Sequence, residues 1–282
     1  MSAVKPSINP SASAAVVVEQ TSMVFNEGRS NQVDALADID LVVAPRDFVA
    51  LIGPSGCGKS TLLRLIANLI EPTSGTVLVN GKSARQSRLD QDYGMAFQQS
   101  GLFEWRTVRK NIELPLELKG WGKSQRRARA DEMLELVQLA EFGDHLPWQL
   151  SGGMQQRVAI ARALAAHPPL LLMDEPFGAL DEMTREHMQS ELLRICAAAG
   201  TTVVFVTHSI PEAVYLSSRV VVMSPRPGRI TNVIDVPLGD DRSEDTREDD
   251  SFYGLITEVR EALRASETSD PVGGSARGIE DR

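Results

Sequence analysis

The sequence is poor in cysteine, in basic residues and in long apolar runs, and each scarcity argues against a class of protein. Two cysteines, Cys57 and Cys196, are too few for a disulfide framework and lie outside metal-binding spacings, so we expect a reducing compartment. The 29 Lys and Arg residues are outnumbered by 38 Asp and Glu residues, which argues against a general nucleic-acid-binding protein. No stretch approaches about 18 uncharged apolar residues, so the sequence predicts no membrane-spanning helix.

What is present is the composition of a globular chain. Its 282 residues are 42% apolar, which suits one large domain or a domain with an inserted lobe. Residues 1–14 are rich in Ser, Ala and Pro and lack a sustained apolar core, so we expect a disordered leader and not a signal peptide. Residues 15–238 are expected to form the domain, residues 239–265 an acidic linker with an amphipathic helix, and residues 266–282 a disordered tail.

Apolar runs of strand length alternate with helical patterns through the domain. This alternation predicts an α/β protein with a parallel sheet. Asn80 and Gly81 follow one of the runs and favour a hairpin turn. Residues 99–150 lack strand runs and carry apolar residues at helical spacing, which predicts an inserted helical lobe. The strand-like runs are residues 16–18, 41–43, 48–52, 76–79, 95–97, 170–173, 203–206 and 220–223.

Residues 53–60 match the complete phosphate-loop pattern G-x-x-x-x-G-K-[ST], between a predicted strand and a predicted helix. Backbone N–H groups of such a loop surround phosphate oxygens at the positive end of the helix dipole. We expect Lys59 to reach the β- and γ-phosphates and Ser60 to place its hydroxyl on Mg²⁺. Cys57 is either an activated thiol at the helix N-terminus or a small filler residue, and the second is favoured. The predicted nucleotide-binding residues of this segment are Gly53, Pro54, Ser55, Gly56, Cys57, Gly58, Lys59, Ser60 and Thr61.

Two acidic residues follow the buried-strand pattern of residues 170–173. Asp174, at the carboxyl end of the strand, is expected to hold Mg²⁺ through water, and Glu175 to polarise a water that attacks the γ-phosphate. Most Asp-Glu pairs are solvated loop charges. The apolar run before this pair and the phosphate loop upstream favour the catalytic interpretation, because phosphoryl transfer needs mainly positioning and charge stabilisation.

Residues 150–157 read Leu-Ser-Gly-Gly-Met-Gln-Gln-Arg and place flexible residues where a helical pattern begins. In one interpretation Ser151 caps the helix N-terminus, and Gly152 and Gly153 ease a turn. In the other, the helix mouth is left open for an anion, because exposed N–H groups and a hydroxyl suit a phosphate. The residues by themselves leave both interpretations open.

Taken together, these motifs resemble those of the ATP-binding subunits of ABC transporters, whose signature motif is similar to residues 150–157. The resemblance covers about residues 16–236, with the motifs in the family's order. It implies an α/β fold with a P-loop NTPase core, an N-terminal antiparallel β portion and an inserted helical lobe. It also implies an enzyme, an ATPase that hydrolyses ATP to ADP and phosphate with Mg²⁺.

The same resemblance implies a second copy of the chain as a partner. In the family, two subunits pack head to tail with ATP between them, so the signature residues of one copy meet the phosphates held by the other. Ser151, Gly152 and Gly153 are thereby assigned to a site completed in trans, although Ser151 can also cap its helix. Asp181 resembles a residue of the loop that communicates across the dimer, and its simpler interpretation is a helix cap.

Three isolated residues acquire roles only through the resemblance. Gln98 is similar to the glutamine that touches Mg²⁺ and the attacking water, and His208 to the switch histidine that contacts the γ-phosphate. Phe25 resembles the aromatic residue that stacks on adenine, and its simpler interpretation is a core residue. The implied catalytic set is Lys59, Gln98, Glu175 and His208, and the implied Mg²⁺ set is Ser60, Gln98 and Asp174.

Three stretches are similar to ATPases of the nitrate, sulfonate and taurine importer group, namely residues 175–185, 208–216 and 223–230. Such importers pair two ATPases with two integral membrane permease subunits and a solute-binding protein. The similarity therefore implies a peripheral protein at the cytoplasmic face of a bacterial inner membrane. It does not name the solute, because the solute contacts the other subunits.

The permease is expected to dock near Leu102, Trp105 and the helical lobe. The importer group often has Leu-Pro-Trp-Arg in this segment, and here Glu104 stands in place of the proline. This departure could mark a different partner and hence a different solute.

Two other functions are compatible with a nucleotide site. One is a soluble ABC-type ATPase that acts on nucleic acid or ribosomes, but such proteins usually carry two cassettes, and this chain has one and no basic domain. The other is a subunit that binds nucleotide without turnover. The filled catalytic positions argue against it, and we expect no nucleic-acid partner.

Overall fold

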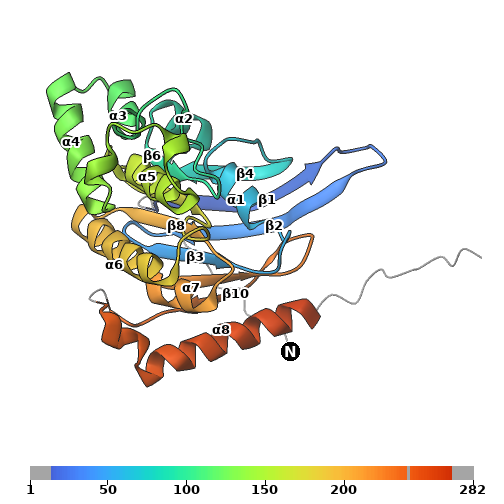
Figure 1. Cartoon of the computed structure of the whole chain (residues 1–282). Coiled ribbons are helices and arrows are strands. Elements are labelled where there is room, and N and C mark those ends of the chain that lie inside the picture. Colours follow the sequence, from blue (N-terminus) through green and yellow to red (C-terminus); the bar gives the residue numbers. More distant parts are fainter. Residues whose placement is uncertain (1–13, 240–241, 269–282) are drawn as a thin grey trace, which may run out of the picture.

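The computed structural model describes residues 14–239 and 242–268 of the chain (Figure 1). The predicted leader, apart from its last residue, and the predicted tail from residue 269 lie outside the described residues. Two sheets and the helices around them form the body of the molecule, and the helical lobe extends from one end of it (Figure 1).

The central sheet has six strands in the order β10-β9-β3-β8-β7-β6, and all are parallel except β10. Its inner strands are apolar on both faces because both faces are covered. In β3, Phe48, Ala50 and Ile52 contribute to one hydrophobic core, and Val49 and Leu51 contribute to a second core behind the sheet. The strands are β3 (Phe48–Ile52), β6 (Tyr93–Ala96), β7 (Leu170–Asp174), β8 (Thr202–Val206), β9 (Arg219–Met223) and β10 (Ile230–Asp235).

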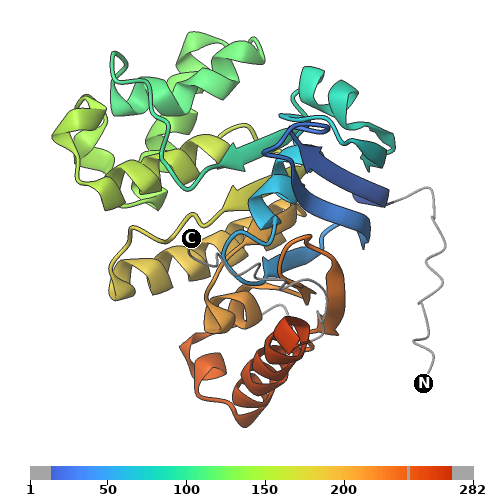
Figure 2. The same ribbon diagram turned by 90° about the vertical axis from the view of Figure 1, so that its right-hand side faces the viewer.

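A second, antiparallel sheet has the order β2-β1-β4-β5 (Figure 2). Its apolar face and the central sheet enclose α1 (Lys59–Ile66), so the helix that follows the phosphate loop is buried between two sheets. Asn80 and Gly81 have positive φ angles of 50° and 74° and connect β4 to β5, as the predicted hairpin requires. The strands are β1 (Val16–Phe25), β2 (Val33–Val43), β4 (Ser74–Val79) and β5 (Lys82–Ser83).

The helical lobe packs α3, α4 and α5 against one another at the edge of the central sheet that ends in β6. Its apolar residues belong to the same core as one face of the sheet. Since α5 contacts both α3 and β6, the lobe continues past its expected limit at residue 150. The elements around it are α2 (Ala84–Leu89), α3 (Val108–Leu118), α4 (Lys123–Leu136), η1 (Ala140–Phe142), η2 (Pro147–Gln149) and α5 (Gly152–Leu164).

The C-terminal helix α8 lies across α7, β9 and β10 (Figure 1). Phe252, Ile256 and Val259 bury one stripe of it, as their helical spacing predicts. The helix runs to Thr268 and buries Ser266, so the expected start of a disordered tail at residue 266 is too early. None of the described helices is long and apolar enough to cross a membrane. The remaining elements are α6 (Glu182–Ala199), α7 (Ile210–Leu216), η3 (Glu244–Arg247) and α8 (Asp250–Thr268).

Candidate functional site

The phosphate loop joins β3 to the first turn of α1, and two of its glycines are required by the backbone. Gly58 is the N-cap of α1 with φ 106°, and a Cβ there would lie 2.5 Å from the Leu36 side chain. A Cβ on Gly53 would lie 2.8 Å from the Met223 carbonyl oxygen. The loop is thus packed tightly against β2 and β9, and it presents the N-terminus of α1 to an open cavity.

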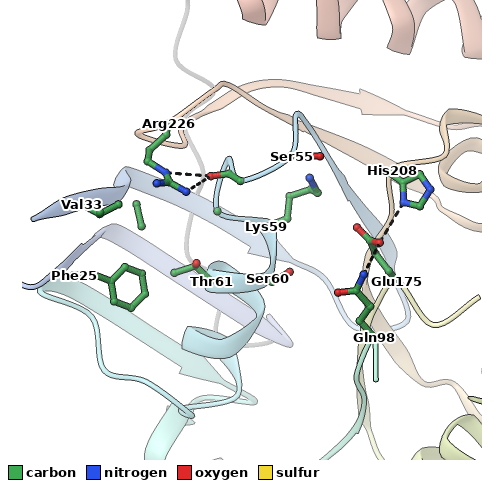
Figure 3. Close-up of a pocket in the computed structure, with 13 residues that line it drawn as sticks. Phe25, Val33, Ser55, Lys59, Ser60, Thr61, Gln98, Glu175, His208 and Arg226 are labelled. Carbon is green, nitrogen blue, oxygen red and sulfur yellow. Dashed lines mark hydrogen bonds and ion pairs between the residues drawn. The ribbon is translucent and has the colours of Figure 1, made fainter. Parts of the chain in front are cut away.

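This cavity has a volume of about 540 Å³ and is lined by residues from six separate parts of the chain: the β1–β2 hairpin, the phosphate loop with the start of α1, and the segments of Gln98, Glu175, His208 and Arg226 (Figure 3). Gly53, Pro54 and Cys57 of the predicted set do not line it. Cys57 is 1% exposed and packs in the core behind the loop, which fits the filler interpretation. The predicted residues that do line the cavity are Phe25, Ser55, Gly56, Gly58, Lys59, Ser60, Thr61, Gln98, Glu175 and His208.

Lys59 is held by the loop from which it projects. Its ammonium group donates hydrogen bonds to the carbonyl oxygens of Gly53 at 2.7 Å and Pro54 at 3.0 Å. The side chain is only 7% exposed, so the charge lies at the base of the cavity, where solvent screens it weakly. A bound phosphate would therefore meet a cation that is already oriented.

Asp174 and Ser60 lie in contact beside the cavity. The Ser60 hydroxyl donates to Asp174 Oδ1 at 2.8 Å, and Asp174 is 5% exposed. Burial raises the pKa of the Asp174 carboxyl, and the bond from Ser60 opposes this effect.

These two residues and Gln98 offer only oxygen ligands, which suit Mg²⁺. Within residues 14–239 and 242–268, no group of three or more His, Cys, Asp and Glu side chains is arranged to hold a metal ion. Ser60, Gln98 and Asp174 would leave the remaining ligand positions of a Mg²⁺ ion to phosphate and water.

The Glu175 carboxylate contacts side chains that follow the two neighbouring strands of the sheet. Its Oε2 accepts a hydrogen bond from Gln98 Nε2 at 3.4 Å and lies 3.2 Å from His208 Nδ1 (Figure 3). Gln98, Glu175 and His208 follow β6, β7 and β8, and the carboxyl ends of these parallel strands lie side by side. Glu175 also has a φ of 47°, a left-handed conformation that costs a non-glycine residue about 1 kcal/mol or more and is frequent at active sites.

The residues assigned to a site in trans do not line the cavity. Ser151 caps α5, with its hydroxyl accepting the Met154 N–H at 3.3 Å, so the capping interpretation holds in this chain. Asp181 caps α6 in the same manner, and its carboxylate accepts the Thr184 N–H at 3.0 Å. This backbone hydrogen bond is the main cause that lowers the pKa of the Asp181 carboxyl.

The two glycines after Ser151 have different surroundings. A Cβ on Gly153 would lie 3.2 Å from the Ala179 carbonyl oxygen, so the signature turn packs against the loop that leads to Asp181. A Cβ on Gly152 would meet nothing within 4 Å. The mouth of α5 is therefore open on the side of Gly152 and Ser151, both of which are exposed.

The helix α5, which begins within the signature motif, also holds the segment that carries Gln98. Gln156 is 3% exposed, and its amide donates to the Phe97 carbonyl at 2.8 Å. Arg162 donates to the carbonyls of Ser100 at 2.8 Å and Gly101 at 2.9 Å. Movement of α5 would therefore move Gln98. No local pattern indicated this link, because Gln156 and Arg162 occupy ordinary positions of a helix.

Three further residues line the cavity but were missed by the sequence analysis. Arg226 donates from Nε and Nη2 to the Gly56 carbonyl at 3.2 and 3.0 Å, across the phosphate loop (Figure 3). Its position after β9, beside the carboxyl ends of the other strands, was a usable signal. Val33 and Ala35 line the cavity from β2, next to Phe25, and depend on the β1–β2 register.

The expected docking region is only partly at the surface. Trp105 is 76% exposed and its ring lies 5.0 Å from that of Phe103. Leu102 is 8% exposed and belongs to the main hydrophobic core, so a permease that docks near it would meet its neighbours at the surface and not its side chain. A cavity of about 440 Å³ lies beside this segment, between the lobe and β6, and is lined by residues that include Phe103 and Leu118.

Known proteins share this arrangement of motifs. Residues 36–178 match a family model described as ABC transporter. An uncharacterized ABC transporter ATP-binding protein of Methanocaldococcus jannaschii is 52% identical over 221 residues, which are 78% of this chain and 82% of the relative. A taurine import ATP-binding protein of Roseobacter denitrificans is 44% identical over 223 residues, 79% of this chain and 82% of the relative.

Among solved structures, a dimeric ATP-binding cassette in a post-hydrolysis state, bound to ADP and Pi, superposes with a TM-score of 0.73. It is 36% identical and is aligned over 78% of this chain and 98% of its own. The predicted α/β fold with a P-loop NTPase core is thereby confirmed, and so is the predicted ATPase class. The chain belongs to the family of ABC transporter ATP-binding proteins.

Proposed function

We propose that this protein hydrolyses ATP to energise the import of a small sulfonate, of the taurine class, through a separate membrane permease. The observation that carries the proposal is the convergence of Lys59, Gln98, Glu175 and His208 on one cavity beside the phosphate loop. The names of the taurine import relatives support the class of solute. Nitrate is the alternative solute, because no residue of this subunit is expected to touch the solute and the subunit itself therefore does not select it.

In the proposed reaction, Glu175 accepts a proton from the water that attacks the γ-phosphate. Its backbone conformation and its contact with Gln98 fix the carboxylate beside the space for that water. Lys59 binds the β- and γ-phosphates, and His208, whose Nδ1 lies 3.2 Å from Glu175 Oε2, contacts the γ-phosphate. Ser60, Asp174 and Gln98 would hold Mg²⁺, which when bound neutralises charge on the phosphates.

A second copy of the chain is the proposed partner across the nucleotide. Ser151 and Gly152 are exposed at the mouth of α5 and lie outside the cavity, so they meet a phosphate only if another molecule brings it. The dimeric cassette bound to ADP and Pi supports this arrangement. Asp181, at the start of α6 and next to the signature turn, is proposed to contact the same partner.

The proposed permease contact is the surface formed by Trp105, Phe103 and Leu118, at the junction of the lobe and the central sheet. Glu104 is exposed within this surface and would contact the permease directly. A subunit docked in this way is a peripheral protein at the cytoplasmic face of the membrane, and we propose a bacterial cell as its setting.

The uptake of labelled solutes by the host tests this function. Deletion of the gene should abolish uptake of one of four solutes, namely taurine, an alkanesulfonate, nitrate and a pyrimidine precursor. The wild-type gene should restore it, and the Glu175→Gln gene should not. Unchanged uptake of all four solutes would remove the importer assignment and leave the ATPase in place.

A further inference from the structure

The C-terminal segment is anchored on α6 and α7 through Arg247, the last residue of η3. The Arg247 guanidinium carbon lies 3.6 Å from the centre of the Tyr215 ring on α7. Its Nη2 donates a hydrogen bond to Gln189 Oε1 on α6 at 2.6 Å. Tyr215 is fully buried and Gln189 is 2% exposed, so both partners are fixed by the core. The segment after β10 therefore reaches a buried polar side chain.

From Gln189 a line of hydrogen bonds continues to the loop that carries His208. Gln189 Nε2 donates to Glu212 Oε1 at 2.9 Å. The Thr207 hydroxyl donates to the other oxygen of Glu212 and accepts the Ser209 N–H at 3.0 Å. Thr207 and Ser209 flank His208, so the backbone on both sides of the histidine is tied to this line.

The chemistry of the end groups fixes the direction of every bond. A guanidinium only donates, so the amide oxygen of Gln189 must face Arg247 and its nitrogen must face Glu212. An ionised carboxylate only accepts, so the single proton of Thr207 goes to Glu212 and its oxygen is left to accept the Ser209 N–H. Loss of Arg247 would leave the buried amide of Gln189 without its donor and free to turn.

The residues that form this line of hydrogen bonds do not themselves line the nucleotide cavity. Of its members and the residues that it holds, only His208 lines the cavity. The His208 side chain is 69% exposed, and its Nδ1 lies 3.2 Å from Glu175 Oε2. Its position is therefore set mainly by the backbone of residues 207–209, to which the line is bonded. Burial raises the pKa of the Glu212 carboxyl, and the bonds from Thr207 and Gln189 oppose that effect.

We propose that Arg247 is a positioning residue that acts on His208 through Gln189, Glu212 and Thr207. Docking of the C-terminal segment thereby sets the rate of ATP hydrolysis. This inference rests on the role proposed for His208. It gives the C-terminal segment a function in turnover, beyond covering α7 and β9.

The full-length Arg247→Met variant tests the proposal, with Arg260→Met as the matched control. Arg260 is exposed on α8 and loses the same charge in the same segment. We expect kcat per ATP-binding chain to fall about five- to tenfold in Arg247→Met, with KM for ATP within about twofold, because the hydrogen bond to Gln189 and the cation–π contact with Tyr215 are lost and no phosphate ligand is touched. Arg260→Met should retain wild-type kcat. A wild-type kcat in Arg247→Met, or a rise in KM without a fall in kcat, would overturn the proposal.

A second set of variants separates positioning from loss of fold. Thr207→Val removes the hydroxyl and should lower kcat as Arg247→Met does, whereas Thr207→Ser keeps the hydroxyl and should retain most of it. The double variant Arg247→Met with Gln189→Leu should be no slower than the slower single variant, because both interrupt one line. Multiplied effects in the double variant, or equal losses in Thr207→Val and Thr207→Ser, would show that the line does not act as a unit and would overturn the proposal.

His208→Ala, measured in parallel, distinguishes failure of this inference from failure of the proposed function. If His208→Ala retains kcat, the role proposed for His208 is wrong and the inference falls with it. If His208→Ala loses kcat while Arg247→Met does not, the role of His208 stands and only the line from Arg247 is overturned.

Discussion

The cavity at Lys59 and the helix mouth at Ser151 both place a helix N-terminus where a phosphate can bind, but they are built differently. Around Lys59 the cation is 7% exposed, and acidic and amide side chains converge on a cavity of about 540 Å³. At Ser151 the hydroxyl is used as a cap and a Cβ on Gly152 would meet nothing within 4 Å. The first gathers the proposed ATP-binding residues within one chain, whereas the second is proposed to meet a phosphate that another molecule supplies.

The cavity at Lys59 and the helix mouth at Ser151 are the two half-sites of one proposed reaction. The largest effect is expected from removing the base of that reaction. Glu175→Gln keeps the shape of the side chain and its contact with Gln98 but removes the base, so kcat should fall by about 10²- to 10⁴-fold. ATP affinity should change little. ATPase rates and equilibrium binding of ATP check this, and ATP should hold the variant as a dimer in size-exclusion chromatography. Wild-type turnover would show that Glu175 is not the base.

Lys59→Ala and Ser151→Arg should separate the half-sites. Loss of the ammonium group that faces the phosphates should raise the Kd for ATP by about 10- to 100-fold. Ser151→Arg, on an exposed cap, should leave the Kd of the single chain within about threefold but prevent the ATP-dependent dimer and turnover. Calorimetry and chromatography of both variants check this. An equal loss of ATP affinity in both would mean that the two regions are not separate.

Phe25 tests how much of the nucleotide site lies within one chain. It lines the cavity at the end of β1, opposite Val33, and is available to stack on a base. Phe25→Ala should raise the Kd for ATP about tenfold, in line with stacking energies of about 1–3 kcal/mol per base. Phe25→Tyr should bind ATP as the wild type does. If Phe25→Ala unfolds the chain or leaves the Kd unchanged, the core interpretation is correct.

Adding one methyl group to each half-site contrasts the two regions, and Gly152→Ala has the smallest expected effect of all the variants. Gly58→Ala would force a residue with φ 106° against Leu36, so it should lower the melting temperature and abolish ATP binding. Gly152→Ala, in open space at the start of α5, should leave stability equal or higher by up to about 1 kcal/mol. Thermal unfolding of both variants checks this. A large loss of stability in Gly152→Ala would show that the helix mouth is not open.

The sequence predicted the parts of the site that depend on short motifs. Residues 53–60 carry their own turn chemistry, and Asp174 and Glu175 follow a strand whose apolar character is plain, so their positions followed from local rules. Gln98 and His208 were found through the resemblance, because an isolated residue has no local signal. What was missed depends on tertiary packing: Arg226 reaches the phosphate loop from the segment after β9, and the Leu102 side chain, in the expected docking region, turns inward to the core.

Mixing two inactive variants tests most directly the claim that the two regions complete one another in different chains. Ser151→Arg keeps an intact cavity and Lys59→Ala keeps an intact helix mouth, so a mixed dimer contains one complete site. We predict that each variant alone has almost no ATPase activity and that an equimolar mixture recovers a substantial part of the wild-type rate, rising with protein concentration. A mixture as inactive as either variant, or full activity of Ser151→Arg alone, would contradict the account.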